Sequence, residues 1–155
     1  MPMLKLPYVP AHYAGHQTAY LLHNSEYFFP PLNGIQTLSN VVLTGLAYYY
    51  SRSASANIPG TSAHLAAAKF PRLAIAAALN FATTAWALGI MVPMNKRMAI
   101  LAKELENSEA GEPKYTSAEK ELRRLQTRWQ KLNYGRACLM VGAALAGVSA
   151  LLIQV

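Results

Sequence analysis

The sequence predicts an all-α fold, an integral membrane helical bundle formed as a single domain over residues 1–155, and three observations lead to it. Charged residues make up 14% of the chain, well below the roughly 25% typical of soluble proteins. Two stretches, 31–50 and 137–155, contain no charged residue, and a third, 72–94, contains only Arg72. Each approaches the roughly 20 apolar residues that a helix needs to cross a bilayer. A soluble all-helical domain is the alternative, but apolar runs of this length are seldom buried in so small a domain.

An aromatic leader punctuated by prolines, 1–30, precedes the first expected span. It has no continuous apolar run followed by a small-residue cleavage site, which argues against a secretory signal peptide. After the first span, the stretch SRSASANIPGTS is too polar and too rich in turn-forming residues to continue a helix. We therefore expect a loop at 51–70 and a second helix that starts at Pro71, a position where proline is tolerated.

A charged segment, 95–136, separates the second and third spans. Within it, NSEAGEPKY predicts a loop, and Thr116 and Glu119 fit a capping box that opens a helix. This helix is expected to run unbroken into the last span, over about 37 residues or about 55 Å at 1.5 Å per residue.

The distribution of basic residues predicts an orientation in the membrane. Ten Lys and Arg residues lie in 95–136, against two in 51–71. Because Lys and Arg are enriched in cytoplasmic loops, the charged segment and the leader are predicted to be cytoplasmic, with the C-terminus across the membrane. The membrane expected is the endoplasmic reticulum or another endomembrane.

Polar residues follow one helix face in each of the first two spans. Since polar side chains that face lipid are costly, both stripes should point into the bundle. Asn40 and Asn80 lie near mid-depth and are expected to hydrogen-bond, as helix-to-helix contacts or as part of a site. The stripes consist of Asn33, Thr37, Asn40 and Thr44 in the first span and of Asn80 and Thr84 in the second.

A second group of polar residues collects at the predicted cytoplasmic leaflet. Trp129, Asn133 and Arg136 are spaced i, i+4 and i+7, on one helix face. The predicted orientation places Asn33 and Asn95 at the same leaflet. The group fits a binding site, or a boundary at which Arg136 snorkels and Trp129 joins an aromatic belt.

Three of the four histidines lie in the leader: His12, His16 and His23. His12 and His16 have i, i+4 spacing, but two histidines alone indicate a metal only weakly, and we expect no metal site. A neutral histidine near a pocket is better suited to act as a general base. The single cysteine, Cys138, excludes an intrachain disulfide and a zinc site built from cysteines.

Four stretches of the chain together resemble a known family: GIMVPMNKRMAILA, WQKLNYGRACLMVGAALAG, PRLAIAAALN and FFPPLNGIQTLSNVVLTGLAYY. The first leads from a membrane helix through Pro-x-Asn into an amphipathic turn, and the second is a W-x3-N-x2-R entry into the last span. They resemble the small integral membrane proteins that include the fungal anthrone oxygenases. The residues that match the family pattern are Arg72, Pro93, Asn95, Trp129, Asn133 and Arg136.

The resemblance implies an all-α membrane bundle and an anthrone monooxygenase of polyketide secondary metabolism. The reaction implied converts an anthrone of the emodin anthrone type to an anthraquinone with O2. Family members usually have four spans, and here the first is either missing or replaced by the leader. O2 is the expected co-substrate and no cofactor is predicted, because the enolate formed by loss of the methylene proton reacts directly with O2.

The chemistry of an anthrone assigns roles to the candidate residues. A flat, apolar substrate favours aromatic walls with a few fixed hydrogen-bond donors. Arg136 and Asn133 are expected to stabilise the developing oxyanion, and His16 or His23 to accept the proton. The residues expected to bind the substrate are Asn95, Trp129, Tyr134 and Asn33.

The alternative function is a non-enzymatic membrane scaffold or accessory protein of a biosynthetic pathway, with 95–136 as its docking surface. The partners expected are a lipophilic small-molecule substrate and membrane lipid, together with pathway enzymes or further copies of the chain. Nucleic acid binding is not expected, because the basic residues have no separate domain on which to form a patch.

Overall fold

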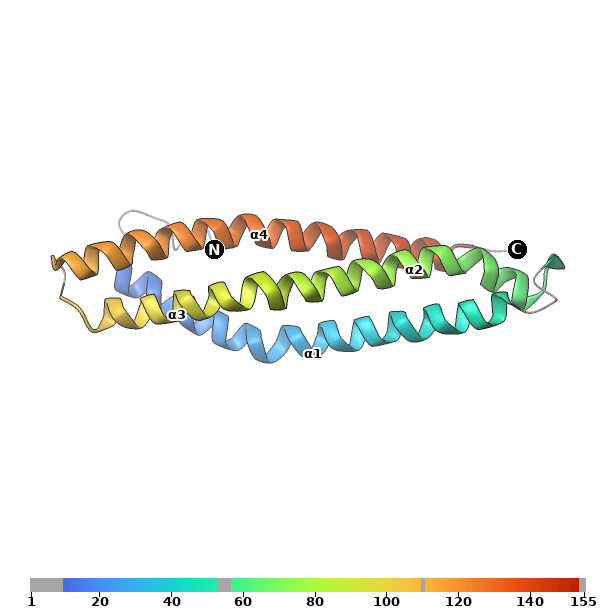
Figure 1. Cartoon of the computed structure of the whole chain (residues 1–155), viewed down its shortest axis with the longest axis horizontal. Helices are drawn as coiled ribbons and strands as arrows, with labels where there is room; N and C mark the ends of the chain where they lie inside the picture. Colours follow the sequence, from blue (N-terminus) through green and yellow to red (C-terminus); the bar gives the residue numbers. More distant parts are fainter. Residues whose placement is uncertain (1–9, 53–56, 110, 154–155) are drawn as a thin grey trace. The chain divides into compact units, whose positions relative to one another are not determined.

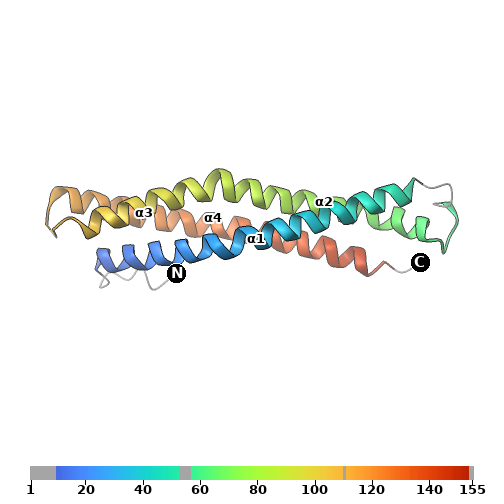
Figure 2. The same cartoon turned by 90° about the horizontal axis from the view of Figure 1, so that it is seen from below.

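The computed structural model describes residues 10–52, 57–109 and 111–153, and the described chain is almost entirely helical (Figures 1 and 2). No strand occurs in these ranges, so the predicted all-α class is confirmed. The elements, in chain order, are α1 (Ala11–Ser51), α2 (Ser62–Trp86), the π-helix η3 (Ala87–Met91), α3 (Val92–Glu106) and α4 (Pro113–Leu151).

Two helical stretches in the described part are long and apolar enough to cross a membrane. They are Ser62–Glu106, which combines α2, η3 and α3, and Pro113–Leu151, which is α4. Within their apolar windows only 22% and 11% of the residues are buried, so most of this apolar surface is available to lipid. Both stretches include a span expected from the sequence. The expected span at 31–50 is helical but is not among these two. The total of three spans therefore stays a prediction.

Helix α1 contains both the described part of the leader and the first expected span. It begins at Ala11 and continues through Pro30 and Pro31. Each proline lacks the N–H that would bond four residues back, so two successive helical hydrogen bonds are missing there. These prolines coincide with the boundary between two compact units of the chain. The first unit comprises 1–30 and 86–135, and the second comprises 31–85 and 136–155.

The start of α2 differs from the prediction. Helix α2 begins at Ser62, and Pro71 lies inside it rather than in its first turn. Thr61 explains the earlier start, because its hydroxyl accepts a hydrogen bond of 3.2 Å from the backbone N–H of His64. The alanine-rich run that follows favours a helix strongly enough to continue through one proline. The loop is therefore shorter than expected.

Helix α4 confirms the prediction of one long helix through the charged segment and the last span. It runs over 39 residues, from Pro113 to Leu151. The expected capping box is wrong, because the helix starts three residues before Thr116, with a proline at its first position. Instead, the Thr116 hydroxyl donates to the Glu112 carbonyl at 3.3 Å, and Glu119 accepts a hydrogen bond of 2.8 Å from Arg123.

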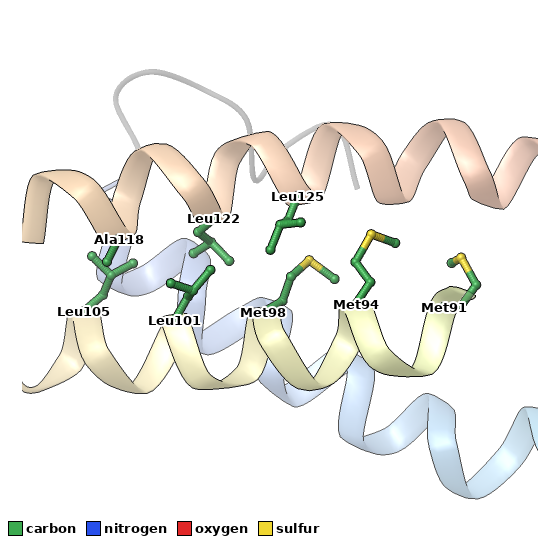
Figure 3. Packing of buried hydrophobic residues seen from close by; sticks show 8 residues of the cluster. All are labelled: Met91, Met94, Met98, Leu101, Leu105, Ala118, Leu122 and Leu125. Carbon is green, nitrogen blue, oxygen red and sulfur yellow. The ribbon is translucent and has the colours of Figure 1, made fainter. Parts of the chain in front are cut away.

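A cluster of methionine and leucine side chains forms the core of the first unit (Figure 3). Its members recur every three or four residues, so one stripe of η3 and α3 packs against one stripe of α4. The leader portion of α1 also lies close to α3, since a Cβ at Gly15 would approach Cα of Ala102 to 3.2 Å. The cluster consists of Met91, Met94, Met98, Leu101, Leu105, Ala118, Leu122 and Leu125.

Small residues form the buried surface of the second unit. Ala76, Ala143 and Ala150 are buried, and a Cβ at Gly142 would lie 3.3 Å from the Leu79 side chain. Such residues allow membrane helices to approach closely.

The polar stripes of the first two spans meet through threonines. The hydroxyls of Thr37 and Thr84 lie 3.5 Å apart. The expected bond between Asn40 and Asn80 is not formed among the described residues. The Asn40 amide donates to the Gln36 carbonyl of its own helix at 3.0 Å, and the buried NH2 group of Asn80 has no partner there.

Candidate polar site around Trp86, Asn95, Trp129 and Asn133

The site begins with an irregularity between α2 and α3. In η3 the backbone N–H of Val92 bonds to the carbonyl of Ala87, five residues back. Pro93 follows at once, and because it has no N–H it cannot bond to the carbonyl of Gly89. A π-turn of this kind accommodates one extra residue in the helix and is common at functional sites.

The π-turn changes which residues face α4. In a regular α-helix, Trp86 and Asn95 are nine positions apart, or about 900°, which places them on opposite faces. The extra residue removes about 100° of this rotation, so the two side chains point roughly 80° apart. Both then reach α4: a Cβ at Gly135 would lie 3.4 Å from Cζ2 of Trp86, and Asn95 is bonded to Trp129.

A hydrogen bond between helices fixes the centre of the site. The indole N–H of Trp129 donates to Oδ1 of Asn95 at 3.0 Å, and both side chains are half-buried. Trp86 and Trp129 also pack against the methionine and leucine cluster. Because the oxygen of the Asn95 amide faces Trp129, its NH2 group is left as a donor; it makes no hydrogen bond among the described residues.

Two further polar atoms of the site are buried without a partner in the described part of the chain. They are Nε1 of Trp86, which is a donor, and Oδ1 of Asn133, which is an acceptor. Asn133 lies one helical turn after Trp129, on the same face of α4. Leaving such a group unpaired costs about 1–3 kcal/mol, so each is available to a bound molecule.

Two other residues expected at the site, Tyr134 and His16, belong to the first unit but take no part in the Trp129–Asn95 hydrogen bond. Tyr134 is 64% exposed, and its hydroxyl lies 3.5 Å from Nε2 of Gln130. The exposed His16 is bonded to Glu106 at 3.0 Å. Glu106 is eleven residues beyond Asn95, or about 16 Å along the helix. The structure does not bring His16 to the Asn95 amide.

His23 lies at a different level from His16. Nε2 of Gln126 donates to the Thr18 hydroxyl at 3.0 Å, which aligns α1 with α4. Five residues further along both helices, about 7.5 Å, ideal helix geometry puts His23 at the height of Lys131, but rotated by about 140° around α1 from Thr18, which contacts α4. Its exposed ring meets Tyr27 edge-on, with centroids 5.1 Å apart.

Three further candidate residues were named from the sequence: Asn33, Arg136 and His12. Asn33 and Arg136 are half-buried residues of the second unit, and their convergence with Asn95 stays a prediction. The side chain of His12 lies outside the described residues.

An ion pair connects α3 with α4. Nε and Nη2 of Arg97 donate to the two carboxylate oxygens of Glu121 at 3.1 and 2.9 Å. These hydrogen bonds hold the pKa of Glu121 below its ordinary value, and the same pairing raises the pKa of Arg97. A bidentate pair fixes the register of the two helices as well as their charge.

The family model for anthrone oxygenase matches residues 23–146, which is most of the chain. The chain belongs to the anthrone oxygenase family. Neither the comparison with curated proteins nor that with solved structures gave a match. The anthrone oxygenase match includes every residue of the site, and the resemblance seen in the sequence is confirmed. His23 is its first residue, whereas His16 lies before it.

Trp86 belongs to the site, but the sequence analysis did not single it out. Its contact with α4 depends on the change of register in η3. The available signal was the pair Gly89 and Pro93 inside an apolar span, since proline interrupts the regular hydrogen bonding of a helix.

Proposed function

We propose that this member of the anthrone oxygenase family is an integral membrane enzyme that oxidises a polyketide anthrone of the emodin anthrone type to an anthraquinone, with O2 as co-substrate and no further cofactor. The observation that carries the proposal is the Trp129–Asn95 pair at 3.0 Å, inside the range that matches the family and beside further unpaired polar atoms. A half-buried indole offers a flat apolar wall, and fixed amides offer the few polar contacts that such a ligand needs.

The reaction replaces the methylene group of the anthrone by a carbonyl. Loss of one methylene proton to a histidine, His23 or His16, gives an extended enolate. Its carbon transfers electrons to O2 and forms a carbon–oxygen bond, and the peroxide anion takes the proton back from the histidine to give a hydroperoxide. The second hydrogen and the O–O bond are then lost, so one oxygen atom becomes the carbonyl and the other leaves as water.

Hydrogen-bond donors accelerate the first step by stabilising the negative charge that develops on the ketone oxygen. We assign this to the guanidinium of Arg136 and the NH2 group of Asn133. Asn95, Trp129, Tyr134 and Asn33 bind the ring system. The NH2 group of Asn95 is oriented for this, because its oxygen is bonded to Trp129.

The proposal includes a location. The apolar helices α2 and α4 cross an endomembrane, with 95–136 on the cytoplasmic side, as the excess of basic residues favours. An anthrone partitions into the same membrane, so the substrate reaches the protein through lipid.

The test is oxidation of emodin anthrone by membranes that contain the chain. Quinone formation under O2 is followed by absorbance and compared with membranes from the same host without the chain. We expect a rate above the spontaneous one, and a loss of at least tenfold in Arg136→Ala, because one oxyanion donor contributes at least this much. Lys131→Ala, an exposed basic residue of the same helix, is the matched control.

Two outcomes count against the proposal. A rate equal to spontaneous oxidation refutes the enzymatic function. Product that forms only in proportion to the amount of protein, without turnover, supports the scaffold function instead. Unchanged activity in Arg136→Ala removes Arg136 from the mechanism.

A further inference from the structure

Charge is distributed unevenly along the antiparallel pair of helices α3 and α4. Six of the seven acidic residues of the chain lie in 104–121, around the turn between the two helices. The seventh, Glu26, is in the leader, and its side chain lies outside the described residues. The stretches 86–103 and 122–135 contain seven Lys and Arg residues and no acidic residue. The end of the pair next to the predicted spans is therefore basic, and the far end is acidic.

Four exposed basic residues lie close to the level of the Trp129–Asn95 hydrogen bond. At 1.5 Å per residue they are about 1.5 to 7.5 Å from this level along their helices. The nearest acidic residue of α3 or α4, Glu121, is about 12 Å from the same level. We call these four residues the basic collar; they are Lys96 on α3 and Arg124, Arg128 and Lys131 on α4.

The collar residues have no acidic partner at ion-pair distance within the part of the chain that the structure describes. The two other basic residues of this region are already paired. Arg97 is bonded to Glu121 at 2.9 Å, and Arg123 to Glu119 at 2.8 Å. These pairs use the two acidic residues of α4, so the positive charge of the collar is directed outward.

The collar lies where α3 and α4 leave the predicted spans. Lys96 follows the span 72–94 by two residues, and Lys131 precedes the span 137–155 by six. Clusters of four or more basic residues at such a position attract anionic lipids of the cytoplasmic leaflet, and the attraction falls off within a Debye length, about 8 Å at physiological ionic strength. An acidic protein would match the charge equally well, but it would have to bind at a boundary that lipid headgroups already occupy. The position therefore favours lipid.

We propose that the basic collar binds the headgroups of anionic phospholipids and enriches them around this protein. The collar supplies the positive charge, and the phosphate and carboxylate groups of the lipids supply the negative charge. The proposal rests on the membrane location proposed above but not on anthrone oxidation, because none of the four residues is among those assigned to the substrate.

The test measures which lipids accompany the full chain. The protein is reconstituted in vesicles of equal amounts of phosphatidylcholine and phosphatidylserine and extracted in mild detergent, and the lipids that remain bound are quantified by mass spectrometry. The collar variant combines Lys96→Gln, Arg128→Gln and Lys131→Gln. Arg124 stays unaltered, because its charge also acts on Glu121.

A matched control changes the net charge by the same amount elsewhere in the same unit. It combines Lys103→Gln, Lys114→Gln and Lys120→Gln, at exposed residues about 12 Å or more from the Trp129–Asn95 level. We expect the unaltered protein and the control to retain phosphatidylserine over phosphatidylcholine by about fivefold, the factor that one basic residue near the surface contributes. The collar variant should lose most of this preference. High salt during extraction should lower the preference in the unaltered protein, since exposed charges are screened.

Two outcomes overturn the proposal. An equal preference in the unaltered protein and the collar variant shows that the collar does not hold the lipid, and leaves it to an acidic protein partner. An equal loss in the collar variant and the control shows that only the net charge matters. Thermal unfolding shows whether each variant is folded, and Lys131→Gln alone, at an exposed position, carries the test with a smaller loss if the collar variant is not.

Lipid retention is measured without turnover, so the proposal and the proposed function fail separately. Anthrone oxidation with equal retention of both lipids supports the enzyme and refutes the collar. Selective retention of phosphatidylserine without oxidation supports the collar and refutes the enzyme. A chain that is not recovered with the vesicles refutes the membrane location and, with it, the lipid-binding collar.

Discussion

The indole N–H of Trp129 on α4 donates a 3.0 Å hydrogen bond to Oδ1 of Asn95 on α3, across 34 positions of sequence. Removing the N–H in Trp129→Phe leaves the amide oxygen without its partner. We expect a loss of about 1–2 kcal/mol in the free energy of unfolding and slower anthrone oxidation, because the amide is no longer held in one orientation.

A double-mutant cycle with Asn95→Leu isolates this bond. Unfolding in denaturant should give a coupling energy of about 1 kcal/mol between Trp129 and Asn95. Strictly additive single-variant losses would contradict a direct interaction between the two side chains.

The buried pair of Thr18 and Gln126 should control the attachment of the leader portion of α1. Thr18 is 1% exposed and Gln126 7%, and the Thr18 hydroxyl also donates to the Ala14 carbonyl at 2.7 Å. Thr18→Val leaves the Gln126 amide buried without a partner, so we expect a destabilisation of about 1–3 kcal/mol. Hydrogen exchange of 11–30 should become faster in this variant.

The double variant Thr18→Val with Gln126→Leu provides the control. Replacing both polar partners by apolar side chains removes the unpaired group, so most of the lost protection should return. Protection that falls further in the double variant would show that the leader is held by other contacts.

Acid should weaken the contact between α3 and α4 through Glu121. The pKa of this carboxyl is lowered in the folded protein by hydrogen bonds from Arg97, from an ordinary value of 4.5. The stabilisation is thus fully present above the unfolded pKa and is lost as the pH falls through the lower, folded pKa. Glu121→Gln should flatten the decline of stability below about pH 4.5, measured by thermal unfolding at a series of pH values.

Salt provides a second check on the same ion pair. Because both side chains are partly exposed, the difference between Glu121→Gln and the unaltered protein should shrink at high ionic strength. Glu112→Gln, in the turn before α4, should retain the acid-dependent decline. An unchanged decline in Glu121→Gln would assign it to other carboxyls.

We predict that His23, rather than His16, acts as the base of the proposed reaction. Ideal helix geometry puts His23 at about the height of Trp129 and Asn133, whereas His16 is hydrogen-bonded to Glu106 at the end of α3. His23→Gln should lower the rate of anthrone oxidation by about 100-fold, the lower limit for loss of a general base. Added imidazole should restore part of the rate.

His16→Gln removes the other candidate base and is the matched comparison. A larger loss in His16→Gln than in His23→Gln would reverse the assignment.

Sequence reasoning identified the parts of the fold that depend on local pattern. The uncharged run at 137–155 and the helical spacing of Trp129, Asn133 and Arg136 predicted α4 as one helix, because both are local properties of the sequence. The start of α2 was misplaced at Pro71, since the helix-forming strength of the preceding alanines and the cap at Thr61 outweighed the proline.

The site was accessible to sequence reasoning only in part. Asn95 was recognised from the Pro-x-Asn pattern that begins at Pro93. Trp129 was recognised because it begins a helix face of regularly spaced polar residues. Trp86 was missed because its orientation depends on a single extra residue in η3, and the spacing of apolar residues along the sequence does not reveal such an insertion. The bond between Thr18 and Gln126 joins positions 108 apart and leaves no local signal at all.

The length of α4 has a consequence for how a substrate arrives. Its 39 residues extend about 58 Å, nearly twice the roughly 30 Å of hydrocarbon in a bilayer. With the predicted last span beginning at residue 137, Trp129 is expected about 12 Å before it, at the depth of the lipid headgroups. A hydroxylated anthrone is itself an amphiphile that collects at this depth. On the proposed function, protein and substrate therefore meet at the lipid–water boundary, and neither has to leave it for the encounter.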